Sequence, residues 1–361
     1  MLTFSAGPSK VYDSMPQYLQ DAYDAGILSA NHRSAAFMNL YREVHQLYCE
    51  KLQMPEDYQL LFTSSATENW EIITQSIVES ASYHIYSGSF GKKWINFAQH
   101  INPETEGLKI EADQAIDVAN LNIAEKFDLI AITQNETSNA TQVPMEVLEE
   151  IRDKYPEKLI AVDTTSSMGG IALNFSLGDV WYASVQKCFG MPAGLGVLIL
   201  SPRAVEQTER KGEKGRYNSL NFMLENARSF QTHYTPNVLG IYLLKRVLQD
   251  IPEIQHISSR LSDRMHQLEQ CIIQTSSLRL LVSNSETRSK TVLGVTGTES
   301  LISEVKKTAE AEGMQLGSGY GPLKPTSFRI ANFPAITDEE MNKLMSFLRK
   351  YEFFNIFLNE F

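Results

Sequence analysis

The chain has 361 residues, 43% of them hydrophobic, and a formal net charge of -11 at pH 7. This length supports a large buried core and excludes a small peptide-like module, while the negative charge provides no basic field for a nucleic-acid backbone. Because no apolar run is long enough to span a bilayer, we expect a cytoplasmic protein that acts on small molecules, with no nucleic-acid or membrane partner.

Short apolar runs alternate with helical patterns through the first two thirds of the chain. The runs typical of buried strands lie at 59–63, 83–87, 127–133, 159–163, 180–185 and 195–200. A helix is predicted over 144–155, because Pro144 suits a first turn and Val147, Leu148 and Ile151 share one apolar face. This alternation predicts the α/β class, with a mostly parallel sheet and crossover helices.

The pattern changes after about Ile251, where one long amphipathic helix is predicted. Its apolar face comprises Ile254, Ile257, Leu261, Met265, Leu268 and Ile272. Further strands are predicted at 278–282, 291–297 and 327–333, and further helices near 299–312 and 338–350. We therefore expect a second, smaller α+β domain, with the last helix as its outer cover.

Lys187 lies where a buried apolar strand ends and a glycine-rich turn begins. Burial lowers the pKa of an ammonium group and yields the neutral amine that forms a Schiff base with a carbonyl cofactor. A lone lysine in this position is more often snorkelling or salt-bridged. Asp163 ends the strand LIAVD, where its carboxylate could pair with a protonated pyridine nitrogen or simply cap the next turn.

The strand 59–63 runs directly into the polar segment TSSATEN, which begins a helical pattern. Free N–H groups at this helix N-terminus, with the hydroxyls of Ser64, Ser65 and Thr67, would bind a phosphate without a strong cation. The alternative is an ordinary Ser/Thr N-cap with Glu68 in the first turn.

Three more side chains follow or interrupt predicted strands. Phe90 could stack on a cofactor ring or belong to the core. Thr137 could donate to a ring hydroxyl or stabilise a turn. Arg329, inside the apolar strand SFRIANF, requires an anion, which is either a substrate α-carboxylate or an internal carboxylate.

Seven motifs occur in the order typical of one enzyme family: FSAGPS, ANHRS, NETSN, AVDTTSS, SVQKCFG, YTPN and FRIAN. On these motifs the chain resembles, over nearly its whole length, the class V aminotransferases of pyridoxal-phosphate fold type I, and among them the phosphoserine aminotransferases. The resemblance implies a large domain with a mostly parallel seven-stranded sheet and a small α+β C-terminal domain. The expected parts are an N-terminal segment (1–15) contributing to the active site or small domain, the cofactor-binding domain (16–250) and the small domain (251–361).

The resemblance also implies a cofactor, pyridoxal 5′-phosphate, bound as a Schiff base to Lys187, with Asp163 at its pyridine nitrogen. The residues that match cofactor-binding positions are Ala66, Thr67, Phe90, Thr137, Asp163, Gln186, Lys187, Tyr234 and Thr235. The residues that match substrate-binding positions are His32 and Arg33 for a distal anion and Arg329 for the α-carboxylate. Because Thr235 reaches the neighbouring subunit's cofactor in this family, a homodimer with shared active sites is implied. No metal site is expected.

The sequence departs from the phosphoserine enzymes near the expected substrate pocket. Thr67 replaces an arginine found in many of them, and GSGYGPLKPTSFR lacks their His-Arg pair before Arg329 and is similar to alanine–glyoxylate and serine–glyoxylate aminotransferases. Lys324 or Arg33 could still hold a phosphate. We expect ping-pong transamination between L-glutamate and 3-phosphohydroxypyruvate in serine biosynthesis, with an alanine or serine donor and a glyoxylate or pyruvate acceptor as the alternative.

Overall fold

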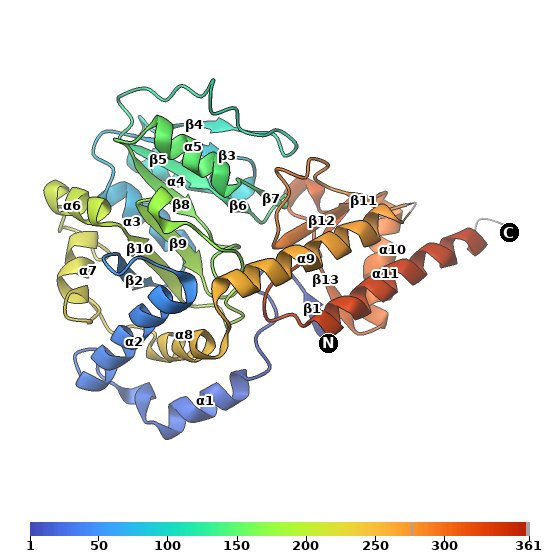
Figure 1. The fold of residues 1–361 in the computed structure, drawn as a ribbon, viewed down its shortest axis with the longest axis horizontal. Coiled ribbons are helices and arrows are strands. Elements are labelled where there is room, and N and C mark those ends of the chain that lie inside the picture. Colours follow the sequence, from blue (N-terminus) through green and yellow to red (C-terminus); the bar gives the residue numbers. More distant parts are fainter. Residues whose placement is uncertain (276, 359–361) are drawn as a thin grey trace.

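Within the residues that this computed structural model describes, 1–275 and 277–358, two main β-sheets organise the chain (Figure 1). The larger sheet lies among most of the helices, and the smaller one lies beneath the two long helices near the carboxyl end. The amino terminus joins the smaller sheet, because β1 (Leu2–Phe4) pairs in parallel with β13 (Met314–Ser318). The small sheet therefore combines segments from both ends of the chain.

The large sheet contains seven strands among the described residues, in the order β2-β10-β9-β8-β5-β3-β4. In chain order they are β2 (Gln59–Thr63), β3 (Ser82–Tyr86), β4 (Glu106–Lys109), β5 (Leu129–Thr133), β8 (Leu159–Asp163), β9 (Val180–Ser184) and β10 (Gly196–Leu200). All neighbours are parallel except that β10 is antiparallel to both β2 and β9. The predicted, mostly parallel sheet is confirmed. The edge strand β4 was not predicted because its residues are fully exposed and have no apolar pattern.

Helices pack around the large sheet and connect its strands. They are α1 (Met15–Asp24), α2 (Ala35–Leu52), α3 (Ala66–Ser76), α4 (Ser89–Ile101), α5 (Met145–Lys154), α6 (Pro202–Lys211), α7 (Leu220–Ala227) and α8 (Val238–Asp250). Helix α5 confirms the prediction for 144–155, and its Leu148 and Ile151 are buried. Pro144 is the N-cap of α5 rather than part of its first turn, and Val147 is only half-buried.

The small sheet has the order β1-β13-β14-β12-β11 within the described part of the chain. The strands and helices that follow residue 250 and have not yet been given are α9 (Ile254–Ile273), β11 (Arg279–Leu280), β12 (Val292–Thr296), α10 (Glu299–Ala311), β14 (Ser327–Ala331) and α11 (Asp338–Leu358). The strand predicted over 278–282 is only two residues long. It ends early because the backbone N–H groups of Ser283 and Asn284 turn away to donate to Asp113. The remaining elements predicted after Ile251 are confirmed.

Helix α9 links the two hydrophobic cores. All six apolar residues of its predicted face are buried. Those of its first half, up to Leu261, pack into the core around the large sheet, and those from Met265 onward pack into the core of the small sheet. The two sheets are therefore held in a defined relation by one continuous apolar stripe.

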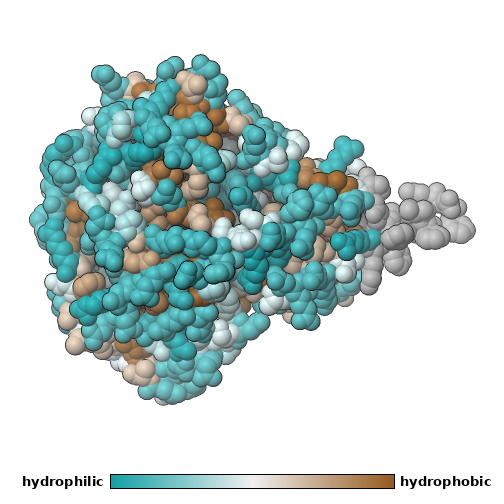
Figure 2. Space-filling view, viewed as in Figure 1, coloured by the Kyte–Doolittle hydropathy of each residue, from teal (hydrophilic) through white to brown (hydrophobic). Residues whose placement is uncertain are grey.

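The surface is mostly hydrophilic on the face seen in Figure 2, where apolar residues occur in small groups. Within residues 1–275 and 277–358, no helix combines the length and the apolar character needed to cross a bilayer.

Arg264 is a buried cation that ties α9 to the segment after β14. Its guanidinium donates to the side chain of Asn332 at 2.6 Å, to the carbonyls of Phe333 and Ile336 at 2.9 and 2.5 Å, and to Asp338 at 3.1 Å. Burial lowers its pKa to about 10. These acceptors would lose their donors if the guanidinium were removed.

We predict that Arg264→Met lowers the free energy of unfolding by about 3 kcal/mol, because buried acceptors are left unsatisfied. Arg260→Met, one turn earlier at an exposed position with a single bond to the Pro334 carbonyl, should cost less than about 1 kcal/mol. Urea unfolding followed by tryptophan fluorescence measures both values. Equal losses for the two variants would contradict the role given to Arg264.

Candidate active site

The carboxyl ends of the parallel strands β5, β8 and β9 meet at one edge of the large sheet. Asp163 is the last residue of β8, Thr137 follows β5, and Lys187 follows β9. In open α/β sheets this edge is where ligands bind. Two of the three side chains, those of Thr137 and Lys187, are in direct contact here.

Lys187 is buried, and its ammonium donates to the hydroxyl of Thr137 at 2.6 Å. Burial lowers the pKa of Lys187 to about 8, although the carboxylates of Asp163 and Glu136 oppose the shift. No carboxylate forms an ion pair with it in the part of the chain that the structure describes. The salt-bridged and snorkelling alternatives are therefore not observed, and the amine is poised for the neutral form.

The Thr137 hydroxyl both accepts and donates a hydrogen bond. It accepts from Lys187 and donates to the hydroxyl of Ser166 at 2.8 Å, and Ser166 in turn donates to the carbonyl of Asn135 at 3.0 Å. The side chain is thus engaged with Lys187 and with the turn after β8, rather than with its own turn. This chain of hydroxyl groups fixes where the lysine nitrogen lies.

Asp163 is buried, and its carboxylate accepts the backbone N–H of Thr165 at 2.9 Å. Burial raises the pKa of Asp163, while the bonds from Thr165 and the charge of Lys187 oppose the shift. The hydroxyl of Tyr182, its partner on β9, also lies against it and accepts from Trp70 at 2.9 Å. The turn cap expected as one alternative is present, but it leaves a desolvated carboxylate that a cationic ring nitrogen would stabilise.

Phe90 is held in place through its backbone. The N–H groups of Phe90 and Gly91 donate to one oxygen of Glu136 at 2.9 and 3.0 Å, and Ser138 donates to the other oxygen at 2.9 Å. A Cβ on Gly88 would lie 2.4 Å from the Glu136 side chain, so the close approach requires glycine. The Phe90 ring centroid lies 5.2 Å from the Lys187 nitrogen.

Arg329 projects from the middle of β14 toward the same site. Its guanidinium donates to the carbonyls of Thr137 at 2.6 Å and Ser318 at 2.8 Å. No carboxylate pairs with it among the residues described, so the internal carboxylate considered as its partner is not observed. Burial lowers the pKa of Arg329, and the cation remains available for an anionic ligand.

The N-terminus of α3 is capped, as one of the two expectations for this segment stated. Ser65 is the N-cap and accepts from the Glu68 backbone N–H at 3.2 Å, while Glu68 accepts from the backbone and hydroxyl of Ser64. The N–H of Ala66 donates to the Ser184 hydroxyl of β9 at 2.7 Å. The cap is therefore confirmed. Thr67 is exposed and Gln186 half-buried, so phosphate binding at this terminus stays a prediction.

The remaining predicted residues lie at the surface, and two of them, Tyr234 and Thr235, line a cavity with Ser64 and Glu68 at the start of α3. The Thr235 hydroxyl lies 3.5 Å from His32, and Arg33 donates to Gln231 at 3.4 Å. Burial, with the charge of Arg33, lowers the pKa of His32. Tyr234 stacks on Tyr217, with ring centroids 4.6 Å apart.

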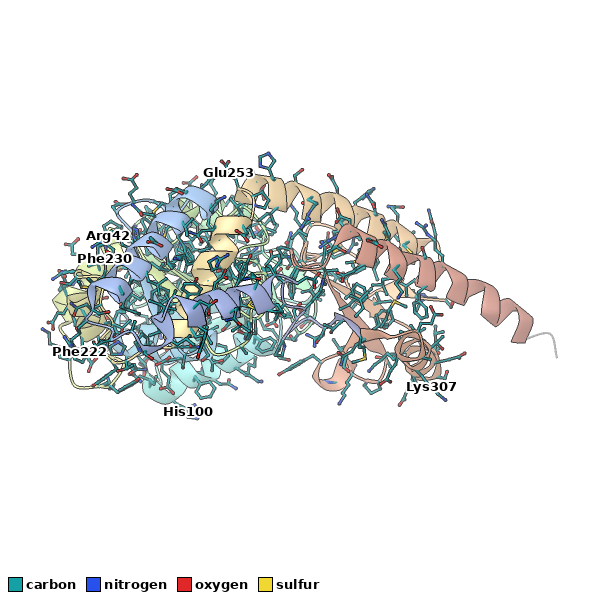
Figure 3. All side chains as sticks on the ribbon, turned by 90° about the horizontal axis from the view of Figure 1, so that it is seen from below. Arg42, His100, Phe222, Phe230, Glu253 and Lys307 are labelled. Carbon is teal, nitrogen blue, oxygen red and sulfur yellow. The ribbon has the colours of Figure 1, made fainter. Side chains whose placement is uncertain are left out.

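This group lies near the end of the molecule remote from the small sheet. Tyr234 also packs against Phe222, which Figure 3 labels at that end, far from Lys307 of α10. Phe230 is labelled beside Arg42 in the same view, and the Arg42 guanidinium carbon lies 4.7 Å from the Phe230 ring centroid. Within the described part of this chain, no hydrogen bond joins the group to Lys187.

The N-terminal segment reaches the site through its backbone. A Cβ on Gly7, which has φ +142°, would lie 3.0 Å from Lys187, and the N–H of Ser9 donates to the Gln186 carbonyl at 3.0 Å. Sequence reasoning missed the supporting residues Glu136, Ser166, Tyr182 and Ser184. Tyr182 and Ser184 are polar groups on one face of an otherwise apolar strand, a signal that could have revealed them.

A buried lysine with a lowered pKa and a desolvated aspartate, both at strand ends of an α/β sheet, are typical of cofactor-dependent enzymes that form Schiff bases. Residues 4–332 match the family model Aminotransferase class-V, and the chain belongs to this family. The family resemblance and the expected fold are thereby confirmed.

Individual relatives include phosphoserine aminotransferases. The protein of that name from Rhodococcus opacus (strain B4) is 27% identical over 354 residues, 94% of this chain and 92% of that protein. A crystal structure of a phosphoserine aminotransferase from Cytophaga hutchinsonii is 34% identical, with a TM-score of 0.92, and covers 97% of this chain and 98% of that chain. An alanine–glyoxylate aminotransferase from Nostoc sp. is 21% identical, with a TM-score of 0.82 over 97% of this chain and 94% of that chain, and is similar in fold.

Family membership implies pyridoxal phosphate, and the buried residues fit this group. Lys187 offers an amine without a carboxylate partner among the described residues, and Asp163 offers a buried carboxylate at the same sheet edge. The Thr165 hydroxyl is buried beside Asp163. These are polar groups that a bound ring with its own donors and acceptors would satisfy.

We predict that Lys187 in the cofactor-free protein reacts with acetic anhydride with a pH midpoint of about 8. The reactive form is the neutral amine, so a lowered pKa brings reactivity to lower pH. Competitive labelling, read by mass spectrometry of the Lys187 peptide, gives the midpoint. A midpoint at the ordinary value of 10.5 would contradict the effect assigned to burial.

Proposed function

We propose that this protein is a pyridoxal-phosphate-dependent aminotransferase that transfers the amino group of L-glutamate to 3-phosphohydroxypyruvate, giving phosphoserine and 2-oxoglutarate, in serine biosynthesis. The observation that carries the proposal is the Lys187 amine, buried against Thr137 at the strand ends beside Asp163. The 34% identity to the Cytophaga hutchinsonii phosphoserine aminotransferase supports the substrate.

Lys187 and Asp163 perform the central proton chemistry in this proposal. When bound, pyridoxal phosphate would withdraw electrons from the α-carbon of an attached amino acid and make its proton acidic. Asp163 would hold the proton on the ring nitrogen, since its buried carboxylate is stabilised by an adjacent cation. Lys187 would hold the cofactor through its amine and, when that amine is free, would act as the base that moves the proton of the substrate α-carbon.

Other residues position the reactants. Phe90 would cover one face of the ring, because Glu136 anchors its backbone at the start of α4. Arg329 would orient the substrate α-carboxylate beside the Thr137 carbonyl to which it already donates. The start of α3 at Ala66 and Thr67, together with Gln186, would bind the cofactor phosphate.

We also propose a homodimer with shared active sites. The exposed group of His32, Arg33, Tyr234 and Thr235 makes no hydrogen bond to Lys187 in the described part of its own chain. In a dimer it would lie at the partner's site, where Thr235 would bind the cofactor phosphate and His32 with Arg33 would meet the substrate. The exposed aromatic surface of Tyr217 and Tyr234 suits burial between subunits.

A second candidate keeps the chemistry and changes the substrate, to an alanine or serine donor with a glyoxylate or pyruvate acceptor. It is favoured by Thr67, an uncharged residue at the exposed start of α3, and by the absence of arginine from the segment 318–327. Because these substrates have small uncharged side chains, they would need fewer cations in the pocket.

The test is the absorption spectrum of the holoenzyme during titration with L-phosphoserine, L-glutamate, L-alanine and L-serine. We expect phosphoserine and glutamate to convert the cofactor, and Lys187→Ala to lower the rate of conversion by at least about 10³-fold because both the anchor and the proton carrier are lost. Lys290→Ala, at an exposed position outside the site, is the control and should behave as the parent.

Conversion by alanine or serine, with no response to phosphoserine, would replace the first candidate with the second. An unchanged rate in Lys187→Ala would refute both candidates.

A further inference from the structure

We infer that Lys93 and Tyr320 form a further contact for the distal anion of the substrate, in addition to the His32 and Arg33 that the proposed dimer would supply, an assignment that rests on the proposed function. Lys93 lies one turn after Phe90 on α4, so both side chains are on the same face of the helix. Its ammonium donates to the Tyr320 hydroxyl at 2.8 Å. Tyr320 comes from the far end of the chain, on the segment that links β13 to β14.

The pair lies at the mouth of the candidate active site. The Lys93 ammonium is 5.5 Å from the ring centroids of both Phe90 and Tyr320, and these two rings are 5.3 Å apart. The Lys187 nitrogen is 5.2 Å from the same Phe90 centroid. Both nitrogens therefore lie close to the same Phe90 ring. A phosphorylated three-carbon amino acid spans roughly 5 Å from its nitrogen to its phosphorus, and in this proposal it extends from Lys187 along that ring toward Lys93.

The pair also lies beside the residue that would bind the α-carboxylate. The Arg329 guanidinium is 5.6 Å from the Tyr320 ring centroid. Arg329 and Lys93 therefore both lie close to the Tyr320 ring, and in this proposal each cation meets one end of a dianionic substrate. An uncharged donor such as alanine would use Arg329 alone.

The chemistry of the pair suits a phosphate or carboxylate. No carboxylate forms an ion pair with Lys93 within the described residues, and its side chain is exposed, so its charge is available to a ligand. The Tyr320 hydroxyl accepts from Lys93 and keeps its own proton to donate. Together they offer two kinds of donor to an anion with several acceptor oxygens. Lys93 would thus supply a positive charge to the substrate pocket, where Thr67 replaces the arginine of many phosphoserine enzymes.

The experiment compares half-saturation for L-phosphoserine, L-glutamate and L-alanine in the holoenzyme and its variants. Lys93→Met should raise half-saturation for phosphoserine and glutamate by about 10- to 100-fold, the effect of one charge-assisted hydrogen bond, and leave alanine nearly unchanged. Lys93→Arg should restore most of the loss, because the charge is kept. Tyr320→Phe should give a smaller selective loss.

Lys92→Met is the matched control. This neighbouring lysine is exposed, carries the same charge and lies 5.9 Å from the Tyr86 ring centroid, away from the Phe90 and Tyr320 pair. It should leave all three donors at parent values.

The outcomes separate the subsite from the proposed function. If the parent converts phosphoserine and Lys93→Met does so equally well, or loses all three donors equally, the subsite assignment is wrong and the proposed function stands. If the parent converts alanine but neither phosphoserine nor glutamate, the proposed function fails and the subsite fails with it.

Discussion

Thr137 makes hydrogen bonds to one residue from each side of the site, Lys187 after the large sheet's β9 and Arg329 in the small sheet. Its hydroxyl receives the buried Lys187 ammonium, and its carbonyl receives the Arg329 guanidinium from the small sheet. Desolvation of Lys187 favours the neutral amine, and the hydroxyl chain through Ser166 holds the nitrogen in place. A displacement of the small sheet would therefore move Arg329 relative to the lysine, which explains why α9 fastens both cores along one stripe.

Two kinds of element could be predicted: helices with one apolar face, such as α9, and strands whose residues are buried on both faces. The strands β5, β8 and β9 are continuous apolar runs for this reason. Strand β4 is exposed along its length, and β1 pairs with β13 across almost the whole chain, so neither leaves a local pattern. The antiparallel direction of β10 depends on the turn after Lys187, whose apolar residues resemble those of any buried segment.

In the candidate site too, some residues could be predicted from a local sequence pattern and others could not. Lys187 and Asp163 were predictable because each is a charge placed at the end of an apolar strand. Glu136 was not, because its carboxylate acts on backbone N–H groups some forty residues away in the sequence. Lys93 was missed for a similar reason, since its partner Tyr320 lies 227 residues further along the chain. The roles of His32 and Thr235 came only from the family resemblance, and the role proposed for them requires a second chain.

The central claim is that Lys187 is the residue that binds the cofactor covalently. Borohydride reduction of the purified holoenzyme, followed by proteolysis and mass spectrometry, tests it directly. We predict a pyridoxyl adduct on the peptide that contains Lys187 and on no other lysine peptide. An adduct on a different lysine, or a fully loaded protein with no adduct at all, would contradict the account.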